Sequence, residues 1–183
     1  MDDQLTREAW LDEGLKQLAE AGPNALKADP LARSLGVSRG SFYWHFADVG
    51  DFRAAVLARW RSVSTDAIIA ALEGEARREE RLSTLMLRAF MRGDKLERAI
   101  RAWASQDSAA RKAAAEVDAA RVDYISRLLV EAGASTRLAR SRATFLYWAY
   151  LGRLMVADGK LGALPSARLR DIARLMQAGA KES

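Results

Sequence analysis

The stretch Leu35-Gly36-Val37-Ser38-Arg39-Gly40-Ser41-Phe42-Tyr43-Trp44-His45-Phe46 decides the fold of the N-terminal part of the chain. It reads as a glycine turn followed by a short helix. Phe42 and Phe46 are four residues apart, so they share one helical face and point to a core. Tyr43 and Trp44 then fall on the opposite or flanking faces. Because a soluble domain rarely presents such aromatic side chains outward without reason, this face is expected to meet a partner.

A supporting helix is predicted before the turn, over residues 29–35. Asp29-Pro30 fits an N-cap followed by Pro at the first helical position. The helix can instead begin near Lys27, since Pro is tolerated in a first turn. Gly36 supplies the turn, and Ser38 can cap the next helix. A helix, a glycine turn and an exposed second helix together predict a helix-turn-helix, whose second helix enters the DNA major groove.

The remaining sequence predicts helices throughout, so the fold class is all-α. A first helix is expected over residues 7–21, between a Thr6 N-cap and the stop Gly22-Pro23. Residues 51–73 contain no Pro or Gly, and they predict one connecting helix on the order of 30 Å long. Further helices are predicted over residues 78–91, 95–105, 108–132, 136–157 and 166–178. We divide the chain into an N-terminal domain at 1–50 and a C-terminal helical domain at 51–183.

Composition bounds the function but does not assign it. The chain has 183 residues, no Cys, one His and a formal net charge of +5. Residues 1–61 carry eight Lys or Arg and nine Asp or Glu, so the predicted DNA-binding part is not basic. A DNA-binding prediction must therefore depend on the motif and on local cations, not on the isoelectric point.

Several classes of protein are disfavoured by what the sequence lacks. No apolar run approaches the roughly 20 residues that cross a bilayer, and the polar, acidic N-terminus argues against a signal peptide. A chain without Cys and with one His offers no thiolate or multi-histidine metal site, and it suits the cytoplasm. No phosphate-binding loop, dinucleotide fingerprint or nucleophile motif is present, so we expect no enzyme, no catalytic residue and no cofactor.

In this layout the chain resembles the TetR family of bacterial transcriptional repressors. The resemblance covers about residues 6–60 and is carried by Leu31-Ala32, Leu35-Gly36-Val37-Ser38, Gly40-Ser41 and Phe42-Tyr43-Trp44-His45-Phe46. It implies an all-α homodimer that binds a palindromic operator in double-stranded DNA. It also implies a C-terminal domain that dimerises and binds a small effector, whose identity the sequence does not give.

The same resemblance implies roles for the residues of the motif. Arg39, Gly40 and Ser41 would approach base edges. The residues that would contact phosphates and flanking bases are Tyr43, Trp44 and His45. Lys27 stands where the family commonly has Thr or Ser, and it could supply a phosphate contact; Ser38 completes the predicted DNA-binding set. Val49 replaces the Lys or Arg that commonly begins the fourth helix, which predicts weaker nonspecific binding and a shallower salt dependence.

Two further surfaces are predicted in the second half of the chain. Large apolar and polar-aromatic side chains are either plain core or an effector pocket: Met86, Phe90, Trp103, Asp107, Tyr124, Trp148 and Leu151. Helices 121–132 and 136–157 are either intrachain core or a four-helix dimer interface, with these candidate contacts: Leu128, Phe145, Trp148, Ala149, Gly152 and Val156.

The function predicted from the sequence is a dimeric, ligand-responsive DNA-binding regulator, most often a repressor. The alternative is a helical interaction protein that kept the fold and lost operator binding. The departures at Lys27 and Val49 and the acidic balance of residues 1–61 favour that alternative.

Overall fold

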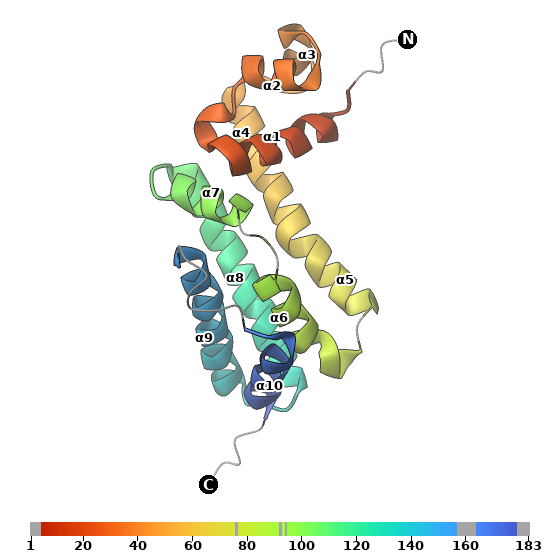
Figure 1. Cartoon of the computed structure of the whole chain (residues 1–183), viewed down its shortest axis with the longest axis vertical. Coiled ribbons are helices and arrows are strands. Elements are labelled where there is room, and N and C mark those ends of the chain that lie inside the picture. The colour runs from red at the N-terminus through yellow and green to blue at the C-terminus, as the bar shows by residue number, and fades with distance from the viewer. Residues whose placement is uncertain (1–4, 76, 92, 94, 157–163, 179–183) are drawn as a thin grey trace. The chain divides into compact units, whose positions relative to one another are not determined.

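The structure is a computed structural model that describes residues 5–75, 77–91, 93, 95–156 and 164–178. Within these ranges all regular secondary structure is helical, which confirms the all-α class (Figure 1). The main helices are α1 (Arg7–Ala21), α2 (Ala28–Leu35), α3 (Arg39–Tyr43), α4 (Val49–Arg61), α5 (Ala67–Glu75), α6 (Arg81–Met91), α7 (Lys95–Ala104), α8 (Ser108–Glu131), α9 (Thr136–Met155) and α10 (Ser166–Gln177). None of the described helices is long and apolar enough to cross a membrane.

The chain forms two compact units, and each is made of two segments. One unit contains residues 1–64 and 94–116; the other contains residues 65–93 and 117–183. These units do not coincide with the predicted boundary at residue 50. The reason is that α4 and α7 both pack on α1, which keeps them in the N-terminal unit.

The N-terminal unit is built around helix α1. The Thr6 hydroxyl accepts a hydrogen bond from the Ala9 N–H at 3.2 Å, and the helix ends at Gly22, whose φ is 76°. Gly14 lets α4 cross α1 closely, because a Cβ at this position would lie 2.7 Å from the Phe52 ring and 2.9 Å from Val56. The bounds of α1 are those predicted from the cap and the Gly-Pro stop.

The connecting segment differs from the uninterrupted helix that was predicted over residues 51–73. Helix α4 is followed by a π-helical turn at Ser62–Asp66, after which α5 begins. Within this turn the Thr65 side chain is buried, and its hydroxyl accepts a hydrogen bond from Arg121 Nε at 3.0 Å. The widened turn therefore places the polar Thr65 side chain in the C-terminal unit. Such π-helical turns frequently occur at functional sites.

The C-terminal unit packs α5, α6, α9 and α10 with the second part of α8 (Figure 1). Its core is mostly aliphatic and includes Leu72, Leu82, Leu128, Leu129, Leu146 and Leu169. Helix α9 turns Ala139, Ala143 and Leu146 inward. The opposite face of this helix carries large apolar residues that the single chain leaves exposed.

Candidate nucleic-acid interface

The helix-turn-helix is formed by α2 and α3, joined at Gly36. Helix α2 begins at Ala28, with Lys27 at the N-cap position, so Pro30 lies inside the first turn. The N-cap predicted first, at Asp29, is wrong, and the alternative start near Lys27 is confirmed. Gly36 has φ 70°; its N–H binds the Arg33 carbonyl, and the Val37 N–H binds the Ala32 carbonyl at 3.0 Å. This pair of bonds is a Schellman ending, which needs the left-handed conformation that glycine adopts without strain.

An aromatic cluster fixes the inner face of α3. Phe42 is fully buried, and its ring centroid lies 5.5 Å from Trp10, 5.2 Å from Phe46 and 5.3 Å from Phe52. Phe46 and Phe52 are themselves 4.8 Å apart. Because such edge and tilted contacts set the rotation of a short helix, the outer face of α3 is set by packing rather than by its own hydrogen bonds.

The outer face of α3 is polar and aromatic. Trp44 is 82% exposed and Tyr43 is 46% exposed, while Arg39 and Gly40 are also exposed. Ser41 and His45 are half-buried at the margins. The structure therefore brings the predicted α3 contact residues to one surface.

Two predicted caps next to this surface act through the backbone. Ser38 occupies the N-cap position of α3, but its side chain forms no capping bond, and the Ser41 N–H binds the Ser38 carbonyl at 3.1 Å instead. Lys27 likewise makes no side-chain cap. Within the described part of the chain, Lys27 and Arg33 are exposed and form no ion pair. Both cations are accordingly available to phosphate.

Gly40 is not required by the folded chain. A Cβ built at this position meets only the Ser38 Oγ, at 3.6 Å, which is an ordinary contact. Gly40 also lies in a right-handed helix, where Ala is the better residue. The described part of the folded chain thus leaves space over Gly40 into which a partner can approach closely.

Acidic side chains at the start of α4 serve as caps. The Asp48 carboxylate accepts from the Asp51 N–H at 2.8 Å, and the Asp51 carboxylate accepts from the Ala47 N–H at 3.1 Å. This reciprocal arrangement is similar to a capping box, except that the Asp51 carboxylate accepts from the residue before the N-cap and not from the N-cap residue itself. Helix α4 begins at Val49, as the resemblance implied, and thus two residues before the start at Asp51 that the residue pattern predicted. The N-terminus of a helix can bind a phosphate in other proteins, but here the Asp48 carboxylate already accepts from one of its N–H groups, and Asp51 adds a second negative charge.

The predicted effector residues are divided between the two units. Met86 and Tyr124 are buried in the C-terminal core, and Phe90 and Leu151 pack against it. Trp148 is 66% exposed on α9. Trp103 and Asp107 lie in the N-terminal unit, on α7 and just before α8.

Asp107 and Trp103 have a local structural role. The Ala110 N–H donates to Asp107 Oδ1 at 2.9 Å, which caps α8 and lowers the pKa of this carboxyl; the Trp103 side chain donates to it as well. Capping alone accounts for the presence of an acid here.

Tyr124 is the polar group in the C-terminal core that stands out. Its ring is buried, its hydroxyl has no hydrogen-bond partner among the described residues, and burial raises its pKa. Since a buried hydroxyl without a partner costs free energy, it is a natural point for a ligand to bind.

A polar and aromatic network in the same unit was missed by the sequence reasoning. The Tyr147 hydroxyl donates to Asp118 Oδ1 at 2.6 Å, and Arg121 reaches both Thr65 and the Tyr147 hydroxyl. The guanidinium groups of Arg121 and Arg153 both lie over the Tyr150 ring, at 5.9 and 5.8 Å. The sequence signals this network only through the i, i+3 spacing of Asp118 and Arg121 on α8. The link to Thr65 could not be predicted, because it depends on the π-helical turn.

The predicted dimer residues form an exposed stripe, with one exception. Phe145, Trp148, Ala149 and Gly152 lie on the exposed side of α9, and Val156, which is also exposed, follows its last residue as the C-cap. Met155, which is not among the predicted dimer contacts, is 81% exposed beside them. Leu128 is buried in the core of its own chain, so a direct interface contact from it is not supported.

The geometry is that of a helix-turn-helix protein, in which the second helix of the motif exposes polar and aromatic side chains. Residues 11–56 match the model of the tetR family of bacterial regulatory proteins. The HTH-type transcriptional regulator AcrR of Shigella flexneri is 38% identical over 48 residues, which is 26% of this chain. That match spans only 22% of the length of AcrR.

Two solved structures are similar to nearly the whole chain. The crystal structure of E. coli NemR in its reduced form has a TM-score of 0.68 at 18% identity, covering 93% of this chain and 94% of NemR. A protein of Rhodococcus sp. assigned to the TetR-family transcriptional regulators has a TM-score of 0.65 at 21% identity, covering 93% of this chain and 96% of that one. The N-terminal domain therefore belongs to the tetR family, and the chain shares the fold of these two solved structures.

Proposed function

We propose that the protein is a sequence-specific DNA-binding regulator of transcription, and that α3 reads the operator. The observation that carries this proposal is the exposure of Trp44 and Tyr43 on α3 while Phe42 is fully buried. An arginine can donate two hydrogen bonds to guanine, and hydroxyl or imidazole groups can donate to phosphate. The proposed base contacts are Arg39, Gly40 and Ser41, and the proposed backbone contacts are Lys27, Ser38, Tyr43, Trp44 and His45.

The regulator acts as a homodimer in this proposal. One short recognition helix gives little specificity, and two copies related by a two-fold axis can read a palindrome. The exposed stripe of α9 supports this arrangement, because Phe145, Trp148 and Met155 would be costly to leave in water. Ala149 and Gly152 in the same stripe allow close helix approach.

A small effector bound in the C-terminal unit releases the operator, which makes the protein a repressor. The pocket residues retained in this proposal are Met86, Phe90, Tyr124 and Leu151, of which Tyr124 offers the unpartnered hydroxyl. The helical segment α4 to α5 runs through both units and can couple them. Thermodynamic linkage then requires that effector and operator each weaken the binding of the other.

Selection from random duplex DNA at about physiological salt tests the DNA-binding proposal. The full chain is expected to enrich a palindrome, and Tyr43→Ala is expected to lose the enrichment. Glu20→Gln, a substitution on an exposed residue of α1, is the control and should enrich the same sites as the unaltered chain.

A folded dimer that enriches no sequence would contradict the proposal. It would favour the second candidate, a helical interaction protein without an operator. The observation that favours this candidate is the start of α4, where Val49 offers no cation, the Asp48 carboxylate already accepts from the Asp51 N–H, and Asp51 adds a second negative charge.

A further inference from the structure

The guanidinium of Arg39 is held from two sides on the outer face of the helix-turn-helix. Arg39 Nε lies 3.6 Å from Asp29 Oδ1, which comes from the first turn of α2. On the other side, Arg39 Nη2 donates to the Tyr43 hydroxyl at 3.2 Å, and the guanidinium lies 5.7 Å from the Tyr43 ring centroid. The α2 carboxylate, at ion-pair distance, and the α3 phenol, through a hydrogen bond, together favour one direction of an otherwise exposed side chain.

This arrangement leaves the arginine able to read a base. A guanidinium carries five N–H donors in a rigid fork, and within the described part of the chain Asp29 and Tyr43 engage its Nε side and one Nη2 hydrogen. The donors that remain can make the bidentate contact to guanine O6 and N7. A long side chain that is already held loses less conformational freedom when it binds.

The negative charge of Asp29 also affects the affinity for DNA of any sequence. A carboxylate on the DNA-facing surface repels phosphate whatever the base sequence, so it lowers nonspecific affinity. On the correct sequence, the orientation that it gives to Arg39 offsets this repulsion. One side chain can therefore increase the ratio of the affinity for the operator to the affinity for other DNA.

We propose that Asp29 is a positioning residue for Arg39, and that the Asp29–Arg39–Tyr43 contact sets how strongly the protein discriminates its operator from other DNA. The inference depends on the proposed function, since it assigns a specificity device to the same surface. Asp29 also lies in the first turn of α2, where a negative charge stabilises the helix through its dipole. Helix stability alone, however, does not change the ratio of two DNA affinities.

The test measures the affinity of the full chain for two duplexes of equal length, the selected operator and a scrambled version, over a salt series. Asp29→Asn is expected to lower the ratio of the two affinities by about fivefold, the low end of what one bidentate arginine contact supplies. Asp29→Glu keeps the charge but moves the carboxylate; it should also lower the ratio, with little change on scrambled DNA. In the Arg39→Ala background, Asp29→Asn should leave the ratio unchanged.

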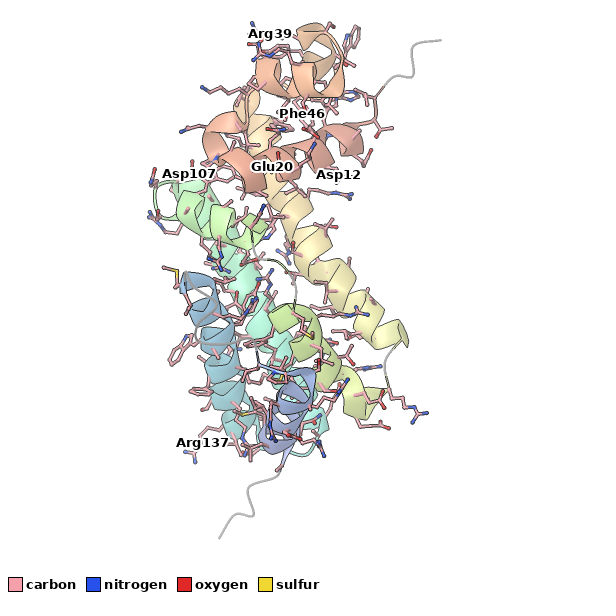
Figure 2. All side chains as sticks on the ribbon, viewed as in Figure 1. Asp12, Glu20, Arg39, Phe46, Asp107 and Arg137 are labelled. Atoms are coloured by element: carbon pink, nitrogen blue, oxygen red, sulfur yellow. The ribbon has the colours of Figure 1, made fainter. Side chains whose placement is uncertain are left out.

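Glu20→Gln is the matched control, because Glu20 is an exposed acid of the same unit that lies far from Arg39 (Figure 2). It removes the same charge and should leave the ratio unaltered. If the unaltered chain selects an operator and Asp29→Asn keeps the full ratio, or acts equally with and without Arg39, the inference is overturned and the proposed function stands. If the unaltered chain selects no operator, the proposed function fails first.

Discussion

At the scale of single residues, the aromatic cluster around Phe42 separates a buried face of α3 from an exposed one. The sequence allowed this separation to be predicted, because Phe42 and Phe46 share a helical face. It did not reveal that Gly40 has room for a Cβ in the free chain, since that depends on where Ser38 lies. The role of Trp103 could not be predicted from the sequence either. A tryptophan can line a pocket or donate a hydrogen bond to a capping carboxylate, and in the structure Trp103 donates to Asp107.

Gly40→Ala separates stability from binding. Ala in place of a helical Gly is expected to raise the free energy of unfolding by up to about 0.5–1 kcal/mol. The added methyl group should weaken operator binding by about tenfold, or ~1.4 kcal/mol, because it blocks close approach to DNA. Denaturant unfolding and operator titration measure the two effects. Gly74→Ala, at an open helical position in α5, should change stability alone; unaltered operator affinity in Gly40→Ala would show that Gly40 has no such role.

Tyr124→Phe should stabilise the protein. Removing a buried hydroxyl that has no partner is expected to raise the free energy of unfolding by about 1 kcal/mol at neutral pH. Burial raises the pKa of Tyr124 in the folded state, so above about pH 10 the unfolded chain loses its proton first and the unaltered protein loses stability. The advantage of Tyr124→Phe should therefore grow as the pH rises through that region.

Tyr147→Phe is the contrasting control, because the Tyr147 hydroxyl is bonded to Asp118. This variant should be less stable than the unaltered chain. A loss of stability in Tyr124→Phe at pH 7, measured by the same denaturant unfolding, would show that the Tyr124 hydroxyl is satisfied in solution.

At the scale of elements, the helix bounds could be predicted where residues next to the helix end form the cap or the stop. Thr6 and the Gly22-Pro23 stop specify α1, and Gly36 ends α2. The π-helical turn at Ser62–Asp66 could not be predicted, since no Pro or Gly marks it and its polar contact comes from Arg121, far along the chain. Tertiary contacts therefore decide where the connecting helix is interrupted.

The start of α4 controls nonspecific DNA affinity in this account. Val49→Lys would restore a cation at the N-terminus of the helix, and each new phosphate contact steepens the dependence of log K on log salt by about 0.9. The measurement is a salt titration on scrambled duplex. Ala58→Lys adds the same charge to an exposed position about 13 Å further along α4 and should leave the slope unaltered. Equal slopes for Val49→Lys and the unaltered chain would contradict this role of the α4 start.

At the scale of the whole molecule, the two compact units are each discontinuous in sequence. The prediction of a boundary at residue 50 followed the motif and could not foresee that α7 packs on α1. Helical periodicity did identify the exposed stripe of α9, but it placed Leu128 with that stripe because a pattern on α8 does not say which of its faces meets the core.

The dimer depends on the α9 stripe. Trp148→Glu is expected to weaken dimerisation by about 30-fold or more, the usual effect of removing a central interface tryptophan, and to weaken operator binding with it. Sedimentation over a concentration series measures the change. Met91→Glu, on an equally exposed apolar residue of α6, should leave the dimer intact. A Trp148→Glu protein that stays fully dimeric would place the interface elsewhere.

The measurement that tests the central claim most directly is a hydroxyl-radical footprint of the full chain on its selected palindrome. The account predicts two protected regions whose centres are one helical turn apart, about 34–36 Å, or a multiple of it, with both lost together in Tyr43→Ala. A single protected region, or protection that survives Tyr43→Ala, would contradict the claim that two copies of α3 read the operator.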